Sequence, residues 1–177
     1  MSDSEDLADL RTGADYQFGA GAGEALFPSE ETVTIRRSSG GRPRQIIDGD
    51  VDDTPGSPEG NRLVSYGTDG RFTLGVTGAR RLQTLFSGLS HRIVVGSESE
   101  PYVRDGRNAF AKFVTAADEE IRPGDEVLVV DGEDTLFAVG RAELSGREAL
   151  AFESGVAVKV RHGVGNDASA EALPEDL

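Results

Sequence analysis

The second half of the chain is a close series of short apolar segments separated by turn signals. Arg122-Pro123-Gly124-Asp125 has the residues of a type II turn, and Asp131-Gly132-Glu133-Asp134 is typical of a hairpin. Short strands at this spacing predict a small, partly closed β-barrel that begins at His91. The expected strands are residues 92–95, 111–116, 126–130, 135–142 and 155–160, with mixed helix and turn over 98–110 and a helical turn over 145–152.

The first half mixes helical and strand patterns. Apolar residues recur at helical spacing over residues 8–27 and again over 78–86. Between them four strands are expected: residues 32–36 alternate, a turn signal at residues 38–41 leads to a strand at 42–47, and a hairpin signal at 68–70 joins strands at 63–66 and 71–74. We therefore expect an α+β protein, in which a small α/β domain over residues 10–90 precedes the barrel over 91–163.

The net charge of −14 is unevenly placed. Residues 1–10, 48–59 and 164–177 hold four, five and four acids and no Lys or Arg. We expect disorder over residues 1–9 and 164–177 and a mobile loop over 48–61. The rest of the chain is near charge balance, so its charge is compatible with nucleic-acid binding. Many acids, with sixteen Arg and only two Lys, are typical of a protein adapted to molar salt, where charge repulsion is screened. An ordinary acidic protein with acidic tails is the alternative.

Several classes of function are disfavoured. The chain has no cysteine, so it forms no disulfide and no thiolate metal site. His91 and His162 lack further ligands, and the acidic segment from Asp48 has Asp53 where a calcium loop needs glycine. No nucleophile signature, apolar membrane span or signal peptide is present. We expect no catalytic residue, no metal, no cofactor, no membrane partner and a cytoplasmic location.

Residues 14–27, ADYQFGAGAGEALF, hold three alternating glycines. A phosphate-binding loop would need Lys and Ser or Thr after the last glycine, or a preceding strand, and neither is present. The helical spacing around them predicts a helix whose glycines allow close packing. A contact of this backbone with a phosphate group is a second interpretation.

Residues 91–163 resemble a PUA domain, through the segments GRNAFAK, IRPGDEVLVVD, FAVGRAEL and GVAVKVRHG. The amino-acid sequence of these segments is similar to the C-terminal end of archaeosine tRNA-guanine transglycosylases. Residues 15–90 resemble the accessory domain that precedes the PUA domain in those enzymes, through DYQFGAGAGEALF, VTIRRSSGGRPRQI and DGRFTLGVTGARRL. The resemblance implies a PUA-type β pseudo-barrel after a small α/β domain.

The resemblance implies RNA binding in a groove between the first helix of the PUA domain and a neighbouring strand, with a contribution from the closing strand. It nominates Arg104, Arg107, Asn108, Phe110, Lys112, Phe113, Lys159, Arg161 and His162. A second basic group could face an RNA backbone: Arg36, Arg37, Arg42, Arg44, Arg80 and Arg81. Each group has an alternative to RNA contact. The two phenylalanines point to opposite faces if the chain is extended, so core packing is their alternative. Pairing with acids is the alternative for the arginines.

The resemblance implies that the full-length enzymes of this family have a TIM barrel with an Asp nucleophile and a Cys/His zinc site. A cysteine-free sequence of 177 residues does not hold such a barrel or such a zinc site. We therefore expect an RNA-binding protein without chemistry of its own. Its partners would be structured RNA, above all tRNA near the acceptor end, and a tRNA-modifying enzyme. Two alternatives are a non-catalytic subunit of a split transglycosylase and a protein-interaction module that has lost RNA binding.

Overall fold

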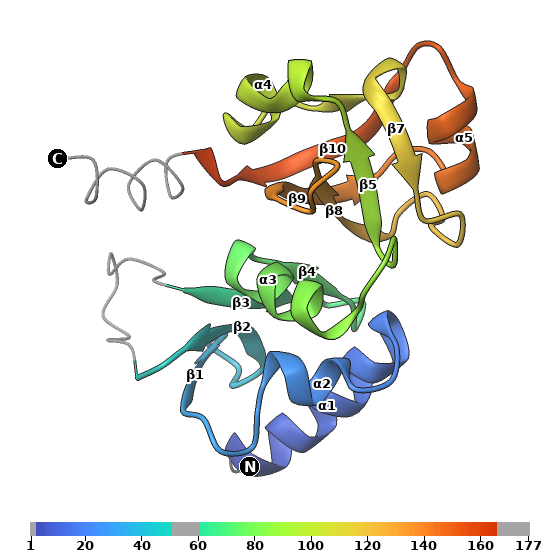
Figure 1. The fold of residues 1–177 in the computed structure, drawn as a ribbon. Coiled ribbons are helices and arrows are strands. Elements are labelled where there is room, and N and C mark those ends of the chain that lie inside the picture. The colour runs from blue at the N-terminus through green and yellow to red at the C-terminus, as the bar shows by residue number, and fades with distance from the viewer. Residues whose placement is uncertain (1–2, 51–60, 166–177) are drawn as a thin grey trace, which may run out of the picture. The chain divides into compact units, whose positions relative to one another are not determined.

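The computed structural model describes residues 3–50 and 61–165 and divides into two compact units, Met1–Phe86 and Ser87–Leu177 (Figure 1). Each unit has its own sheet. The division falls shortly before the boundary expected between residues 90 and 91. Most of the expected acidic loop, at 51–60, and the expected tail from residue 166 onwards lie outside the described residues.

The N-terminal unit is a four-stranded antiparallel sheet in the order β1-β2-β3-β4, with helices packed against it. The four expected strands are confirmed within one or two residues. Their apolar residues, among them Ile46, Leu63 and Phe72, are buried in the unit. The elements are α1 (Asp3–Phe18), α2 (Ala22–Leu26), β1 (Val33–Arg37), β2 (Pro43–Asp48), β3 (Arg62–Tyr66), β4 (Phe72–Leu74) and α3 (Val76–Leu85).

Helix α1 corrects the expectation of disorder at the N-terminus. It begins at Asp3, so residues 3–9 are helical. Arg37 on β1 forms ion pairs with Asp3 and with Asp6, at 2.8 Å for the latter. Hydrogen bonds to these two carboxylates raise the pKa of the Arg37 guanidinium. An acidic first turn is also favourable at the positive end of the helix dipole, so the acids stabilise order here.

The three alternating glycines end one helix and begin the next, so the single helix expected over residues 8–27 is wrong. Gly19 and Gly21 have φ values of 124° and 91°, in the region where glycine replaces other residues without strain. Gly23 serves close packing, as expected: a Cβ there would lie 2.6 Å from the Arg11 Cα and closer to its carbonyl oxygen. The Gly23 N–H donates to Asp15 Oδ1 at 2.7 Å.

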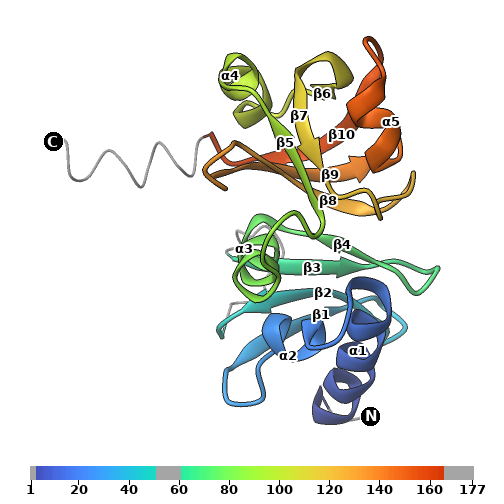
Figure 2. The same cartoon turned by 45° about the vertical axis from the view of Figure 1, so that its right-hand side comes forward.

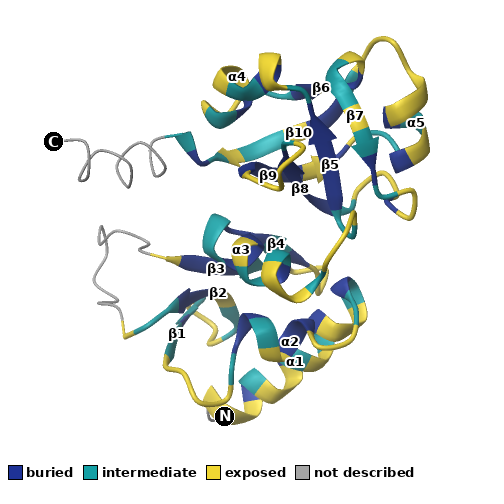
Figure 3. Ribbon diagram, viewed as in Figure 1, coloured by how far each residue is buried: buried dark blue, intermediate teal, exposed yellow. Residues whose placement is uncertain are grey.

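The C-terminal unit is a six-stranded sheet in the order β6-β10-β9-β8-β5-β7. All strand pairs are antiparallel except β5 with β8. Strands β5 and β8 are buried along their whole length (Figure 3). The elements are β5 (Arg92–Val95), η1 (Ser97–Ser99), α4 (Glu100–Arg104), β6 (Ala109–Phe110), η2 (Ala111–Phe113), β7 (Val114–Ala117), β8 (Glu126–Val130), β9 (Leu136–Ala142), α5 (Gly146–Ala151) and β10 (Val156–Gly163).

The order of the strands closes this sheet into a barrel. Strands β6 and β7 occupy opposite edges, yet only the 3-10 turn η2 separates them in the chain (Figure 2). The two edges must therefore come together, and the expected partly closed barrel is confirmed. The strand expected over 111–116 is partly wrong, because residues 111–113 form this turn and only the following residues pair with β5. Ile93, Val127 and Phe137 are buried inside the barrel.

We predict that Gly23→Ala destabilises the N-terminal unit. The new methyl group would meet the Arg11 backbone, which cannot rotate away, so the expected loss is about 2 kcal/mol despite the better helix propensity of alanine. Denaturant unfolding measures the change. Gly13→Ala in α1 is the matched control: its methyl would lie 3.5 Å from the Phe72 ring and should not destabilise the protein. Equal stability of both variants would contradict the packing role.

Candidate nucleic-acid interface

A pocket of about 150 Å³ lies between α4 and the β6–η2 segment of the C-terminal unit. Four of the nine residues nominated from the sequence line it together. Three further residues line the pocket and were missed by the sequence analysis: Ser99, Tyr102 and Val103. They precede the GRNAFAK motif, on which the nomination was based. Pro101 marks the start of the helix that carries them and was the signal available in the sequence. The lining residues are Ser99, Tyr102, Val103, Arg107, Asn108, Phe110 and Phe113.

The end of α4 builds one wall of this pocket. Gly106, with a φ of 96°, reverses the chain directly after the helix. The Gly106 N–H donates to the Val103 carbonyl and the Arg107 N–H donates to the Tyr102 carbonyl, both at 2.9 Å. Val103 is buried and holds the helix on the barrel. This turn places Arg107 next to the pocket.

Asn108 is fixed by a hydrogen bond to the closing strand. Its Oδ1 accepts the Val160 N–H of β10 at 3.0 Å. The amide is thereby oriented, and its Nδ2 group keeps two donors. Within the described residues these donors have no protein partner, so they are available to a ligand.

Phe110 and Phe113 lie on the same pocket, which corrects the expectation that they point to opposite faces. That expectation holds for extended chain, but η2 is a 3-10 turn, in which residues three apart eclipse each other. Phe110 is 43% exposed and Phe113 is partly buried. Tyr102 on α4 is 57% exposed, so two aromatic rings next to the pocket are accessible to solvent.

Three of the nominated cations are exposed and are not engaged in ion pairs within the described part of the chain. Arg107 lies at the pocket, and Lys112 is the middle residue of η2, two positions after Phe110. The Lys112 Nζ lies 5.1 Å from the centre of the Phe113 ring. Lys159 is exposed on β10. These side chains can contact phosphate without first breaking an internal pair.

Two other nominated cations have internal roles. The Arg104 Nε donates to Glu100 at 2.9 Å, and its guanidinium lies 5.3 Å from the centre of the Phe137 ring. Arg161 binds Glu126, which is 6% exposed, through both guanidinium nitrogens. Arg161 lies at a register irregularity of β10, the kind of position that turns a side chain out of the regular alternation. The neighbouring His162 is exposed.

The second basic group, on the N-terminal unit, is also largely engaged. Arg37 is held by the two acids of α1, as described above. The Arg42 guanidinium lies 4.9 Å from the centre of the Tyr66 ring and donates to the Gly67 carbonyl. Arg44 is exposed on β2, and Arg36 is partly buried on β1. The six arginines therefore do not form one free basic surface.

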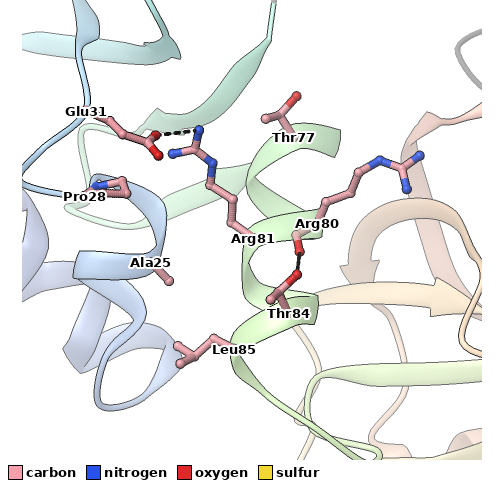
Figure 4. Close-up of a pocket in the computed structure, with 8 residues that line it drawn as sticks. All are labelled: Ala25, Pro28, Glu31, Thr77, Arg80, Arg81, Thr84 and Leu85. Atoms are coloured by element: carbon pink, nitrogen blue, oxygen red, sulfur yellow. Dashed lines mark hydrogen bonds and ion pairs between the residues drawn. The ribbon is translucent and has the colours of Figure 1, made fainter.

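Arg80 and Arg81 border a groove of about 630 Å³ between α2 and α3 (Figure 4). Arg81 anchors one wall, because it pairs with Glu31 at 3.2 Å and Asp48 at 2.9 Å and donates to the Leu26 carbonyl. Arg80 is exposed and points away from Arg81 in Figure 4. The remaining lining residues are Ala25, Pro28, Thr77, Thr84 and Leu85.

A nearly closed barrel with a short helix beside a pocket is the architecture of a PUA domain, and residues 91–164 match the family model of that domain. Residues 8–88 match the patch-forming domain C2 of tRNA-guanine transglycosylase. The chain thus combines a region that matches this C2 domain with a region that matches a PUA domain, as the sequence resemblance implied.

The relatives similar to this chain include archaeal enzymes. The tRNA-guanine(15) transglycosylase of Pyrococcus furiosus is 47% identical over 152 residues, which are 85% of this chain and 24% of the enzyme. That of Methanothermobacter thermautotrophicus is 39% identical over 161 residues, which are 90% of this chain and 23% of the enzyme. The chain therefore spans about a quarter of the curated relatives it matches, and the shared region is their C-terminal accessory and PUA part.

Solved structures support the fold. The hypothetical protein PH0734.1 of Pyrococcus horikoshii aligns with a TM-score of 0.67 at 23% identity and covers 93% of this chain and 92% of that one. A conserved PUA domain protein of Thermoplasma acidophilum aligns with a TM-score of 0.60 at 19% identity, over 97% of this chain and 96% of that one. Within residues 3–50 and 61–165, no helix has the length and apolar character needed to cross a membrane.

We predict that Arg161→Gln destabilises the C-terminal unit by about 2 kcal/mol, because it leaves the buried Glu126 carboxylate without its charged partner. The partial exposure of Arg161 keeps the loss below that of a fully buried pair. Lys159→Gln, on the same strand, should be neutral for stability. Thermal unfolding of both variants checks this; equal unfolding midpoints would show that the ion pair does not stabilise the barrel.

Proposed function

We propose that this chain binds structured RNA through the PUA unit and that the RNA is a tRNA held near its acceptor end. The observation that carries the proposal is one pocket lined by an uncommitted arginine, an amide and two exposed rings, with Lys112 on the turn beside it. We call these residues the pocket surface: Tyr102, Arg107, Asn108, Phe110 and Lys112. Arginine and lysine bind phosphates, and exposed rings stack on unpaired bases for about 1–3 kcal/mol per base.

The choice of tRNA rests on the relatives. Their names state an action on tRNA, and this chain shares both domains with them. The choice of the acceptor end rests on the shape of the site. A pocket this small beside exposed rings suits a single-stranded end, where bases are free to leave the stack, better than a continuous duplex. We further propose that the chain serves a tRNA-modifying enzyme and performs no reaction itself.

A second candidate is a non-catalytic subunit of a transglycosylase whose catalytic barrel comes from another chain. The observation that favours it is that the matched region of the relatives is their C-terminal accessory and PUA part, and their names state a transglycosylase activity. Stable co-purification with a barrel protein would support it. A third candidate, a protein-interaction module, is favoured by the groove between α2 and α3, whose lining includes the exposed Leu85. It predicts that RNA is not retained at any salt concentration.

We predict that the double variant Arg107→Ala, Lys112→Ala weakens binding to a tRNA at least about tenfold, because each substitution removes a charge-assisted contact to phosphate. It should also reduce the slope of log affinity against log salt by roughly 1.4, which corresponds to two lost contacts to a single strand. Fluorescence anisotropy titrations of labelled tRNA from low to near-molar salt measure both quantities.

The matched control is Arg122→Ala, Arg147→Ala, which removes two exposed arginines of the same unit that do not line the pocket. It should change affinity and slope much less. If both double variants lose affinity equally, binding depends on total charge and not on the pocket surface. If the wild-type chain retains no tRNA at any salt concentration, the proposed RNA binding is wrong.

A further inference from the structure

The groove between α2 and α3 is a surface of the N-terminal unit that the proposed RNA site does not use. Its walls are mainly apolar: Ala25 and Pro28 come from the α2 side, and Leu85 comes from the end of α3 (Figure 4). Leu85 is 41% exposed, although its Cδ2 lies only 3.5 Å from the place of a Cβ at Gly21, where α2 begins. Exposed apolar side chains that line a hollow are typical of an interaction surface.

The volume of this groove suits several side chains. At about 630 Å³ it is roughly four times as large as an engineered cavity of about 150 Å³ that takes one benzene molecule in another protein. About three or four apolar side chains therefore fit. This is also the number that two turns of an amphipathic helix present on one face.

The walls of the groove favour a helical ligand over an extended one. Two helices form these walls, and their main-chain groups bond within each helix; the Ala25 N–H, for example, donates to the Gly21 carbonyl at 3.0 Å. An extended peptide needs an unpaired strand edge for its own main-chain groups, and helical walls do not offer one. A helix satisfies its main chain internally and binds such a groove through its side chains.

The charged groups at the groove disfavour phosphate and favour one acidic side chain. Arg81 is already shared by Glu31 and Asp48, and the Glu31 carboxylate, whose side chain is 53% exposed, would repel a phosphate. Arg80 is exposed and has no ion pair among the residues that the structure describes. In Figure 4 it extends from α3 on the side away from Glu31. An acid on that flank of a ligand gains a charged partner without displacing another one.

We propose that the groove between α2 and α3 binds an amphipathic helix of a partner protein. The helix contributes about three or four apolar side chains from one face, which pack against Ala25, Pro28 and Leu85, and an acidic side chain on one flank, which pairs with Arg80. This inference goes beyond the proposed RNA binding. It assigns a protein contact to the N-terminal unit, whereas the RNA site lies on the C-terminal unit, and each is tested without the other.

The first step of the test selects ligands from a phage-displayed library of helical peptides about 18 residues long, a length at which isolated helices are no longer marginal. The full chain is the target, and its variant Leu85→Asp is the counter-target. The enriched peptides should share apolar residues at helical spacing and an acid on one flank of the apolar face. Failure to enrich any peptide for the wild-type chain over Leu85→Asp would overturn the inference, and so would a consensus without an acid.

The second step measures the affinity of the most enriched peptide by fluorescence anisotropy. Leu85→Asp should weaken binding at least about tenfold, because it removes a buried apolar contact. Arg80→Glu should weaken it roughly two- to fivefold, and a peptide with Lys in place of the acid should recover that loss, because the charges are then opposite again. Arg44→Glu on β2 and Leu150→Asp on α5, exposed positions outside the groove, are the matched controls and should leave the affinity unchanged.

The charge reversal keeps the test decisive if Leu85→Asp lowers the thermal unfolding midpoint, because Arg80 is exposed and its replacement leaves the core intact. Binding that Arg80→Glu does not change, or that the Lys peptide does not recover, would show that the peptide lies elsewhere and would overturn the inference. A loss of tRNA binding in Arg80→Glu, with no peptide enriched, would make the groove a nucleic-acid surface instead. Failure of the wild-type chain to bind tRNA, with the peptide results as expected, would overturn only the proposed function.

Discussion

Closure of the C-terminal barrel by a single 3-10 turn is the constraint on which the candidate site depends. Strands β6 and β7 lie at opposite edges of the sheet, and η2 joins them through only three residues. A connection this short leaves the chain little freedom. The same turn brings Phe110 and Phe113 to one pocket and leaves Lys112 exposed beside them. The pocket is therefore a consequence of how the barrel closes, and its geometry is as fixed as the barrel itself.

Burial and ion pairing separate structural cations from available ones. Arg92, 2% exposed, pairs with Asp134 at 2.7 Å, and Arg161 pairs with the buried Glu126. A buried charge needs such a partner, because the desolvation cost is otherwise unpaid. Lys112 and Arg107 have no comparable commitment within the described residues. The proposed RNA binding therefore depends on a few exposed cations, supported by aromatic rings and amide donors that retain their value when salt screens phosphate contacts.

Much of the fold was predictable from the sequence. Short apolar or alternating segments located most of the strands, and glycine-containing turns such as Thr68-Asp69-Gly70 located the hairpins, because both signals act within a few residues. Errors arose where a distant contact or a glycine backbone conformation decides. The acidic N-terminus resembles a disordered segment, but pairing with Arg37 stabilises it as a helix. The glycine-rich stretch has helical spacing, but the left-handed backbone of Gly19 and Gly21 interrupts the helix.

The sequence by itself determined the two-part organisation, the order along the chain of every strand except the two-residue β6, and the segment around Arg107 and Asn108 as the candidate site. Only the tertiary structure decided which nominated residues lie together and which are engaged elsewhere. Composition and spacing do not reveal that Arg161 is held by an acid two strands away, or that Ser99 is left without a partner at a pocket. These properties depend on burial and on contacts between residues far apart in the chain, and folding alone creates both.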